Sequence, residues 1–366
     1  MLYSFTGTPD GSQPLFTGVI FDQSGNLYGV TAFGGLYNQG TVFELTPSPG
    51  GTWTETVLYS FTGGPDGGQP MGGLVTDGMG NLYGTTSQGG SPGCGTVFAL
   101  SPSGSGGAWT YTVLHAFIPF SDDGCSPQAD LMYDGSIYGT TAGGGHTNQG
   151  TVFWMSTSGG GYTNAYFTRN GGADPFGGLN NRGFGATCLG GKQNQGVIYT
   201  LAYHAETIRS FTIGGKAGTC ALGDLLAVGP YEMYGITWLG GAGGGGTVYQ
   251  LSPNRYRSET WVLSVLHSFP SSEGDGFYPL AGLTADSAGN LYGTASLAKT
   301  SAGIVFELSP EAKHPNKWTE TVLYAFSGPD GSSPTSNLVF DNAGNLYGTT
   351  QYGGDSNKGV VYEVTP

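Results

Sequence analysis

The chain has 366 residues, of which 70 are Gly, 22 Tyr and 19 Phe. Each interior Gly costs a helix about 1 kcal/mol relative to Ala, so this composition excludes a helical protein, and its aromatic content excludes a disordered one. The formal net charge of -14 argues against nucleic acid or an anionic membrane as partner, because both require a basic surface. There is no apolar run of about 18 residues, so no membrane span is expected. Met1 is followed directly by repeat sequence, and we therefore expect no signal peptide in this sequence.

The dipeptide Tyr-Gly or Phe-Gly ends a strand-like run seven times along the chain. The copies are Tyr28-Gly29, Tyr83-Gly84, Tyr138-Gly139, Phe184-Gly185, Tyr234-Gly235, Tyr292-Gly293 and Tyr347-Gly348. Each copy supplies four strand-like runs, A to D, which in the second copy are residues 72–77, 81–86, 95–100 and 109–117. Short strands at this period predict an all-β fold: a seven-bladed β-propeller with four antiparallel strands in each blade.

The order of the runs also predicts how the ring closes. We expect one propeller domain over residues 1–366, with blades at about 6–61, 62–117, 118–170, 171–213, 214–269, 270–326 and 327–366. The chain begins with a lone D run (1–5) and ends with a lone C run (359–366). Residues 1–5 should therefore pair beside residues 359–366 and complete the seventh blade, leaving no open sheet edge. We expect a monomer.

The A-to-B connections, such as residues 77–81, have Gly and Asn where a tight hairpin needs positive φ. Asp77 is therefore expected to cap backbone amides. A structural calcium ion is the alternative, although these loops are too short to supply six oxygens. No other cofactor is expected. The sequence has no P-loop, dinucleotide fingerprint, HExxH pair or GxSxG elbow, which removes the nucleotide-binding, metalloprotease and common hydrolase classes.

The runs "GNLYGTT", "GTVFEL" and "WTETVLYSF" resemble the tandem repeat first described from Gloeobacter and Verrucomicrobia proteins. The double glycine after strand B and the Trp before strand D also resemble kelch repeats. The resemblance covers nearly the whole chain and is weakest over residues 118–269. It implies a propeller of a secreted or surface-anchored bacterial protein, and it implies no particular activity.

The four cysteines occupy equivalent loop positions one blade apart. Of the three connectivities, only Cys94–Cys125 with Cys188–Cys220 joins neighbouring loops, and we predict these two disulfides. They imply an oxidising compartment, namely the extracellular space, the cell surface or the periplasm. Free buried thiols are the alternative. A metal site is not expected, because there is no CxxC or suitably spaced His.

In this strand order the D-to-A and B-to-C loops lie together on one face of the ring, which we call the irregular face. Loops on a rigid scaffold usually carry function, so ligand contacts are expected there. Trp238 follows strand B of blade five, where other copies have Ser87, Ala142 or Gln351. Further aromatic residues are expected in the same layer: Phe33, Tyr37, Phe120, Phe176, Phe277, Tyr278 and Tyr352. Such rings stack on sugars, but they also pack Gly-rich loops.

Strand A should line the central channel, and one position just before it varies between blades. Most copies have a small or amide residue there: Gly18, Gly73, Gly178, Gly282 and Asn337. Blades three and five instead have Asp130 and Asp224. Two carboxylates at a channel mouth are candidates for the acid and base of glycoside hydrolysis, with an expected separation of roughly 10 Å. The alternative is that they cap loop amides.

Basic and imidazole groups are scarce on the irregular face. His146, Lys192 and Lys216 are expected there in blades three to five. With nearby Tyr residues they are candidates to neutralise and deprotonate a uronic acid, as a polysaccharide lyase requires. The alternative is that they are solvated loop residues. His115 and His267 replace the Tyr of strand D and are expected to be structural.

An Asp-Gly-x-x-Pro element recurs on the irregular face, with its carboxylates at Asp10, Asp66, Asp123, Asp275 and Asp330. Its Gly and Pro mark a turn, so we expect the aspartates to set loop shape. A cation bound by several of them is the alternative.

Three hypotheses for function follow. The favoured one is a secreted or surface-displayed propeller that binds a poly- or oligosaccharide on the irregular face, with Trp238 stacking on a sugar. The second is a polysaccharide lyase or glycoside hydrolase that uses Asp130, Asp224, His146 or Lys216. The third is a structural module that binds other proteins through exposed aromatic residues.

Overall fold

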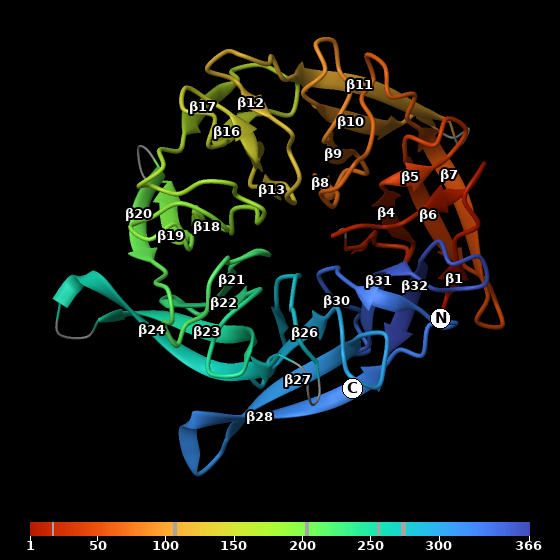
Figure 1. The fold of residues 1–366 in the computed structure, drawn as a ribbon. Coiled ribbons are helices and arrows are strands. Elements are labelled where there is room, and N and C mark those ends of the chain that lie inside the picture. The colour runs from red at the N-terminus through yellow and green to blue at the C-terminus, as the bar shows by residue number, and fades with distance from the viewer. Residues whose placement is uncertain (17, 105–107, 202–204, 255–256, 272–275) are drawn as a thin grey trace.

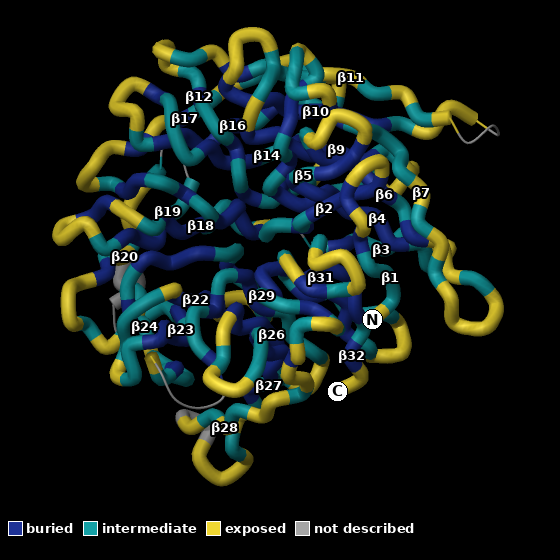
Figure 2. Tube along the Cα trace, turned by 45° about the vertical axis from the view of Figure 1, so that its right-hand side comes forward, coloured by how far each residue is buried: buried dark blue, intermediate teal, exposed yellow. Residues whose placement is uncertain are grey.

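The protein is a ring of seven β-sheet blades around a central channel (Figure 1), as the repeat predicted. The computed structural model describes residues 1–16, 18–104, 108–201, 205–254, 257–271 and 276–366. Among these residues no helix is long and apolar enough to cross a membrane. Buried strands make up the body of each blade, while loops and hairpin tips are exposed (Figure 2).

The first three blades each have four antiparallel strands, which follow one another in chain order from the channel outwards. Blade one has β3 (Ile20–Phe21), β4 (Leu27–Thr31), β6 (Thr41–Pro47) and β7 (Trp53–Ser60). Blade two has β8 (Val75–Thr76), β9 (Leu82–Thr86), β10 (Thr96–Pro102) and β11 (Trp109–Ala116). Blade three has β13 (Met132–Tyr133), β14 (Ser136–Thr141), β16 (Thr151–Ser156) and β17 (Thr163–Tyr166).

Blade four departs from the predicted four strands, because three are present in its described part. They are β18 (Phe184–Thr187), β19 (Val197–Leu201) and β20 (Ala205–Ser210). A tight turn takes the place of the inner strand: the Asn180 side-chain oxygen accepts hydrogen bonds from the amides of Arg182 and Phe184 at 3.0 and 3.1 Å. The sequence "NNRG" is too short for the hairpin that the other copies make.

Blades five to seven have four main strands again. Blade five has β21 (Leu226–Val228), β22 (Glu232–Thr237), β23 (Gly244–Asn254) and β24 (Arg257–Pro270). Blade six has β25 (Thr284–Ala285), β26 (Leu291–Ala295), β27 (Ile304–Glu311) and β28 (His314–Ala325). Blade seven has β30 (Val339–Phe340), β31 (Leu346–Tyr352), β32 (Val360–Val364) and β1 (Tyr3–Ser4).

The ring closes as predicted, with the N-terminal strand completing the last blade. Tyr3 pairs with Val361 and Ser4 with Val360 in antiparallel register, and the two termini lie close together (Figure 1). Short strands on the irregular face add to the blades: β2 (Gly11–Ser12) pairs with β5 (Phe33–Gly34), β12 (Gly124–Cys125) with β15 (Gly143–Gly144), and β29 (Ser332–Pro334) with β31.

The repeated Tyr-Gly pair is explained by packing on both sides of strand B. A Cβ at Gly84 would lie 2.6 Å from Cζ of Phe98, a fully buried ring of the neighbouring strand, so only Gly fits. The Tyr before the Gly receives the Trp of the next blade: Trp109 meets Tyr28 edge-on at 6.1 Å between ring centroids. Equivalent contacts join Trp53 to Tyr347, Trp261 to Phe184 and Trp318 to Tyr234.

Where it occurs in the described residues, the Asp-Gly-x-x-Pro element helps to join a blade to the one before it. In blade two, Asp66 accepts hydrogen bonds from the Tyr59 hydroxyl (3.0 Å) and the Thr62 amide (2.9 Å), which fixes the loop. The amide of Gln69, whose φ is 51°, then donates to the carbonyl of Gln39 in blade one at 2.7 Å. Asp10, Asp123 and Asp330 make equivalent bonds to the strand-D side chains, so these aspartates do set loop shape. Asp275 lies outside the described residues.

Candidate functional site

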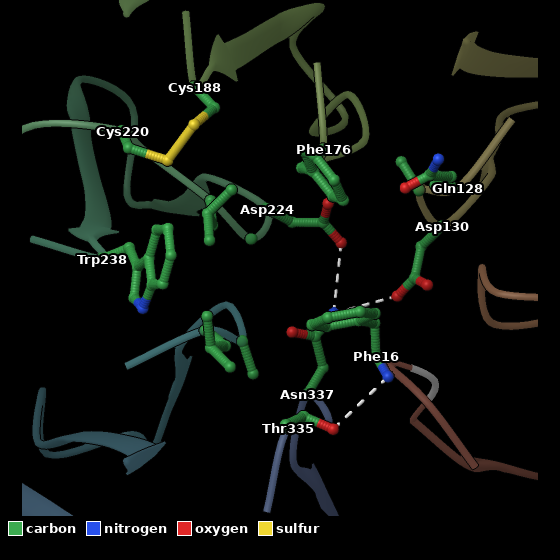
Figure 3. Close-up of a pocket in the computed structure, with 15 residues that line it drawn as sticks. Phe16, Gln128, Asp130, Phe176, Cys188, Cys220, Asp224, Trp238, Thr335 and Asn337 are labelled. Atoms are coloured by element: carbon green, nitrogen blue, oxygen red, sulfur yellow. Dashed lines mark hydrogen bonds between the residues drawn. A yellow bond between two sulfur atoms is a disulfide. The ribbon is translucent and has the colours of Figure 1, made fainter. Parts of the chain in front are cut away.

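The central channel holds three polar side chains that come from the position before strand A. Asp130 of blade three, Asp224 of blade five and Asn337 of blade seven all point to the channel axis (Figure 3). The Asn337 Nδ2 donates to Oδ2 of Asp130 at 2.9 Å and to Oδ2 of Asp224 at 3.2 Å. Since one nitrogen reaches both carboxylates, the expected separation of roughly 10 Å was wrong: the two groups are considerably closer.

Glycine in the intervening blades explains why the three side chains meet. The amide of Gly73 donates to Oδ1 of Asp130, and that of Gly178 to Oδ1 of Asp224, each at 2.5 Å. A Cβ at Gly73 would lie 2.9 Å from that Asp130 oxygen. Each polar residue thus leans over the blade before it, and the glycine there leaves it room. The two aspartates do accept loop amides, as the alternative interpretation expected, and they also face a pocket.

The pKa values of both carboxyl groups lie above the ordinary range. Desolvation inside the channel raises the pKa of Asp224 to about 7, and the nearby charge of Asp130 adds to this effect, against the opposing hydrogen bonds from Gly178 and Asn337. Desolvation likewise raises the pKa of Asp130, opposed by the hydrogen bonds from Gly73 and Asn337. Two carboxyl groups so close in a poorly solvated site disfavour double ionisation, so the pair tends to hold a proton near neutral pH.

A pocket of about 280 Å³ opens above these groups on the irregular face. Its floor includes Asp130, Asp224 and Asn337, and its walls are largely apolar and aromatic. The wall residues come from blade one (Phe16), blade three (Gln128, Ala129), blade four (Phe176, Cys188), blade five (Cys220, Leu222, Gly223, Trp238), blade six (Leu280, Ala281) and blade seven (Thr335). On the other side of the floor, Asp224 and Asn337 also line a second hollow with Asn180 and Leu225. The polar floor therefore separates two hollows along the channel.

Two aromatic pairs flank the pocket. Trp238, whose exposed fraction is 37%, meets Tyr278 edge-on at 6.1 Å between centroids. Phe16 meets Phe176 edge-on at 6.4 Å. These contacts hold the rings in place; Phe16, Phe176 and Trp238 face the pocket (Figure 3), whereas Tyr278 does not line it.

Both predicted disulfides are present, and one of them forms part of the pocket wall. Cys188–Cys220 joins the loops of blades four and five, and Cys94–Cys125 joins those of blades two and three. The amide of Trp238 donates to the carbonyl of Cys220 at 3.0 Å, so this disulfide helps to position the tryptophan. Two disulfides are typical of an oxidising, extracellular type of environment.

Other predicted site residues do not line this pocket. His146 pairs with Asp122 at 3.1 Å, and both side chains are exposed. Lys216 borders a separate hollow with Arg209. Lys192, Tyr37, Phe120 and Tyr352 are exposed elsewhere on the chain, and Phe33 is half-buried in β5. The structure thus brings together Asp130, Asp224, Phe176 and Trp238, with Tyr278 behind Trp238.

Sequence reasoning did not assign Phe16, Gln128, Thr335 or Asn337 to the site. Asn337 had a signal, because it occupies the same repeat position as the two aspartates. Phe16 also had one: Pro14 and Gly18 are four positions apart, whereas Pro70 and Gly73 are three apart, so blade one has an extra residue. Phe16 has a φ of 53°, uncommon for a bulky side chain, and its amide donates to Thr335 Oγ1 at 3.4 Å.

The repeated turns on the opposite face have no grouped metal ligands. Asp77 accepts hydrogen bonds from the amides of Met79 (2.8 Å) and Asn81 (3.2 Å) and from the Asn81 side chain (2.6 Å), as expected of a capping residue. Within the described ranges, no three His, Cys, Asp or Glu side chains gather as a metal site.

Fold and pocket together define a seven-bladed propeller whose channel is closed by a polar floor beneath an aromatic pocket. The chain belongs to the family of the Gloeobacter/Verrucomicrobia repeat, whose model matches residues 1–184 and 133–362. No curated protein matches the sequence.

Solved structures of similar fold share little sequence with this chain. A hypothetical selenium-binding protein from Sulfolobus tokodaii has a TM-score of 0.56 at 12% identity, covering 92% of this chain and 86% of its own. A putative 6-phosphogluconolactonase from Bacteroides fragilis has a TM-score of 0.52 at 12% identity, and the match covers 88% of this chain and 85% of that one. A putative 6-phosphogluconolactonase from Bacteroides uniformis has a TM-score of 0.51 at 14% identity, and the match covers 88% of this chain and 90% of that one. At these identities the likeness concerns the fold alone.

Proposed function

We propose that this protein binds carbohydrate in the central pocket of its irregular face. The observation that carries the proposal is the combination of Trp238 on the wall with hydrogen-bonding Asp130 and Asp224 on the floor. Aromatic rings pack against the apolar faces of sugar rings, while carboxylates accept hydrogen bonds from hydroxyl groups. At about 280 Å³ the pocket is near the lower end of small-molecule sites, which are typically ~300–1,000 Å³. It therefore suits the end of a glycan chain better than an internal stretch.

The disulfides support an address outside the cytoplasm, and we propose secretion, surface display or residence in the periplasm. A protein there meets polysaccharides of cell walls and of the surroundings. The net charge of -14 is compatible with a neutral or positively charged glycan.

The test is a panel of plant, algal and bacterial polysaccharides and their oligosaccharides, followed by affinity-gel retardation. We expect Trp238→Ala to reduce affinity by about two- to twelvefold, because an aromatic stacking contact contributes about 0.5–1.5 kcal/mol and each 1.4 kcal/mol is tenfold. Tyr352→Ala is the matched control, since Tyr352 is similarly exposed (38% against 37%) and does not line the pocket. Equal losses in both variants would contradict the central site. Failure of every glycan to bind would favour a protein-binding module that uses exposed rings such as Phe120.

A glycoside hydrolase is the second candidate, favoured by the close pair of carboxyl groups with raised pKa values. One group would protonate the leaving oxygen while the other, ionised, assists water or the anomeric carbon. A lyase has less support, because no Lys, Arg or His is among the described residues of the pocket wall. New reducing ends measured alongside retardation would show hydrolysis, and absorbance at about 235 nm would show elimination. Product formation that survives Asp224→Asn would exclude a catalytic role for this carboxyl group.

A further inference from the structure

The pocket floor offers mainly hydrogen-bond acceptors to a cationic ligand, because its N–H donors are already used and the proton that the carboxyl pair tends to hold near neutral pH is released when a cation takes its place. Both N–H groups of Asn337 are taken, one by Asp130 and one by Asp224. Each carboxylate accepts this bond and one backbone amide, at Gly73 or Gly178. A carboxylate has room for about four hydrogen bonds, so both keep free lone pairs. A ligand that reaches the floor must therefore supply donors.

The floor also lacks a compensating positive charge. Neither Asp130 nor Asp224 has a salt-bridge partner among the described residues, and no described residue of the pocket wall is basic. Desolvated carboxylates without a partner are costly to ionise, so a cationic ligand gains from both. An anionic sugar would meet repulsion instead.

The orientation of Asn337 distinguishes an organic cation from a metal ion. Its Oδ1 accepts the amide of Gly282 at 2.5 Å, which fixes the NH₂ group on the side of the two carboxylates. Asn binds a metal ion through its side-chain oxygen. Here the Asn337 oxygen faces Gly282 and its NH₂ group faces the two carboxylates, so Asn337 is not oriented to bind a metal ion between them. An ammonium group, with three N–H donors, matches two acceptors better.

The walls suit the organic part of such a ligand. Phe16, Phe176 and Trp238 surround the pocket with aromatic faces and edges, and Leu222 and Leu280 add apolar surface. An aromatic face attracts a cation within about 6 Å and also packs against the C–H groups of a sugar ring.

We propose that the pocket recognises a sugar residue with a free amino group, whose ammonium lies between Asp130 and Asp224 while its ring packs on Trp238. This inference rests on the proposed glycan function and narrows it to unacetylated amino sugars. Asp130 and Asp224 accept charge-assisted hydrogen bonds from the ammonium, and Asn337 holds the two carboxylates at the required spacing.

The experiment compares three β-1,4-linked tetrasaccharides that differ only at carbon 2: glucosamine, N-acetylglucosamine and glucose. Calorimetric titration is done at about pH 6, well below the pKa of a typical α-amino group (about 7.7–8.0), so that the amine is charged even though the oxygens of the sugar ring lower its pKa. We expect the glucosamine tetramer to bind at least about tenfold more tightly than the other two, as charge-assisted hydrogen bonds to two carboxylates imply. We expect Asp130→Asn and Asp224→Asn each to remove most of that preference.

The matched control is a pair of exposed carboxylates outside the pocket, Asp122→Asn with Asp355→Asn, which should leave the preference unchanged. The proposal would be overturned if the preference for glucosamine survived both pocket variants, or if it fell equally in the control. Either result would show that the preference arises from the general attraction between an acidic protein and a cationic glycan. Equal affinity for all three tetramers would also overturn it while leaving glycan binding intact. If neither these tetramers nor any glycan of the wider panel binds, the proposed function falls as well. The wild-type comparison holds even where a variant fails to fold.

Discussion

Aspartates of the repeated A-to-B turns and aspartates of the channel have pKa values shifted in opposite directions by their surroundings. Partial burial by itself would raise the pKa of Asp77, but hydrogen bonds from Asn81, Met79 and Tyr83 together hold it below its ordinary value. Asp286 and Asp341 behave in the same way. Asp130 and Asp224 receive fewer hydrogen bonds and lie in a poorly solvated channel, so their pKa values are raised. The repeated turns stabilise their charges, whereas the channel leaves its charges poorly compensated.

This difference divides the molecule into two parts. The frame consists of the contacts that recur in most blades, such as the turn of Asp77. The channel centre consists of Asp130, Asp224 and Asn337, at a position whose residue differs between blades. Substitutions in the frame should change stability and leave binding alone. Substitutions in or beside the channel centre should change binding, or the dependence of stability on pH. Three further predictions test this division, beginning with the largest effect.

The two disulfides give the largest expected effect and a natural matched pair, because they close loops of similar length, with separations of 32 and 31 residues. Replacing Cys188 and Cys220 together by Ser should lower the free energy of unfolding by about 2–4 kcal/mol, as should replacing Cys94 and Cys125. Only the first change should also weaken glycan binding, since Cys188–Cys220 lines the pocket and Cys220 holds the amide of Trp238. Denaturant unfolding and titration of both variants check this. Identical binding losses would show that the frame and the pocket are not separable.

The channel pair should make stability fall as pH rises. Between the ordinary Asp value of 3.8 and about 7, the folded protein binds more protons at Asp224 than the unfolded chain does. The free energy of unfolding should therefore decrease across this window, by at most about 1.4 kcal/mol per pH unit for one proton. The charge of Asp130 raises the pKa of Asp224 further, while the hydrogen bonds from Gly178 and Asn337 lower it; the raised pKa of Asp130 contributes to the slope in the same direction. Asp224→Asn should flatten the slope, as measured by denaturant unfolding between about pH 4 and 8.

The turn carboxylate should show the smallest effect and the opposite sign. With its folded pKa below 3.8, Asp77 contributes stability that is present above that value and lost as pH falls through the folded pKa. Asp77→Ala should cost about 0.5–1 kcal/mol at neutral pH, by analogy with the loss of a helix-capping side chain, and should leave glycan binding unchanged. Thermal unfolding at about pH 7 measures the loss of stability, and unfolding at about pH 3 shows whether that loss shrinks as the carboxylate becomes protonated. Titration with glycan measures binding. A binding defect in this variant would place part of the site on the opposite face.

Much of the frame could be predicted from the sequence because its contacts are local and repeated. Three features could be assigned from residue order alone: the Gly of each Tyr-Gly pair, the capping Asp of each turn, and the single strand-like runs at the two ends of the chain. Blade four was the exception, since "NNRG" replaces a hairpin by a tighter turn, and whether a strand then forms depends on hydrogen bonds that the letters do not show.

The site was predicted only in part, and for a different reason. Asp130, Asp224 and Trp238 stood out because they break a repeat. The repeat alone could not show that blades three, five and seven aim their side chains at one point, nor that an extra residue in blade one places Phe16 beside Phe176. Residues such as Asp130 and Asn337 are 207 positions apart and meet only because the ring closes. Sequence by itself determined the blade, its turns and the disulfide pairs, which depend on local geometry. Tertiary structure alone decided which side chains share the channel, because closing the ring sets the distances across it.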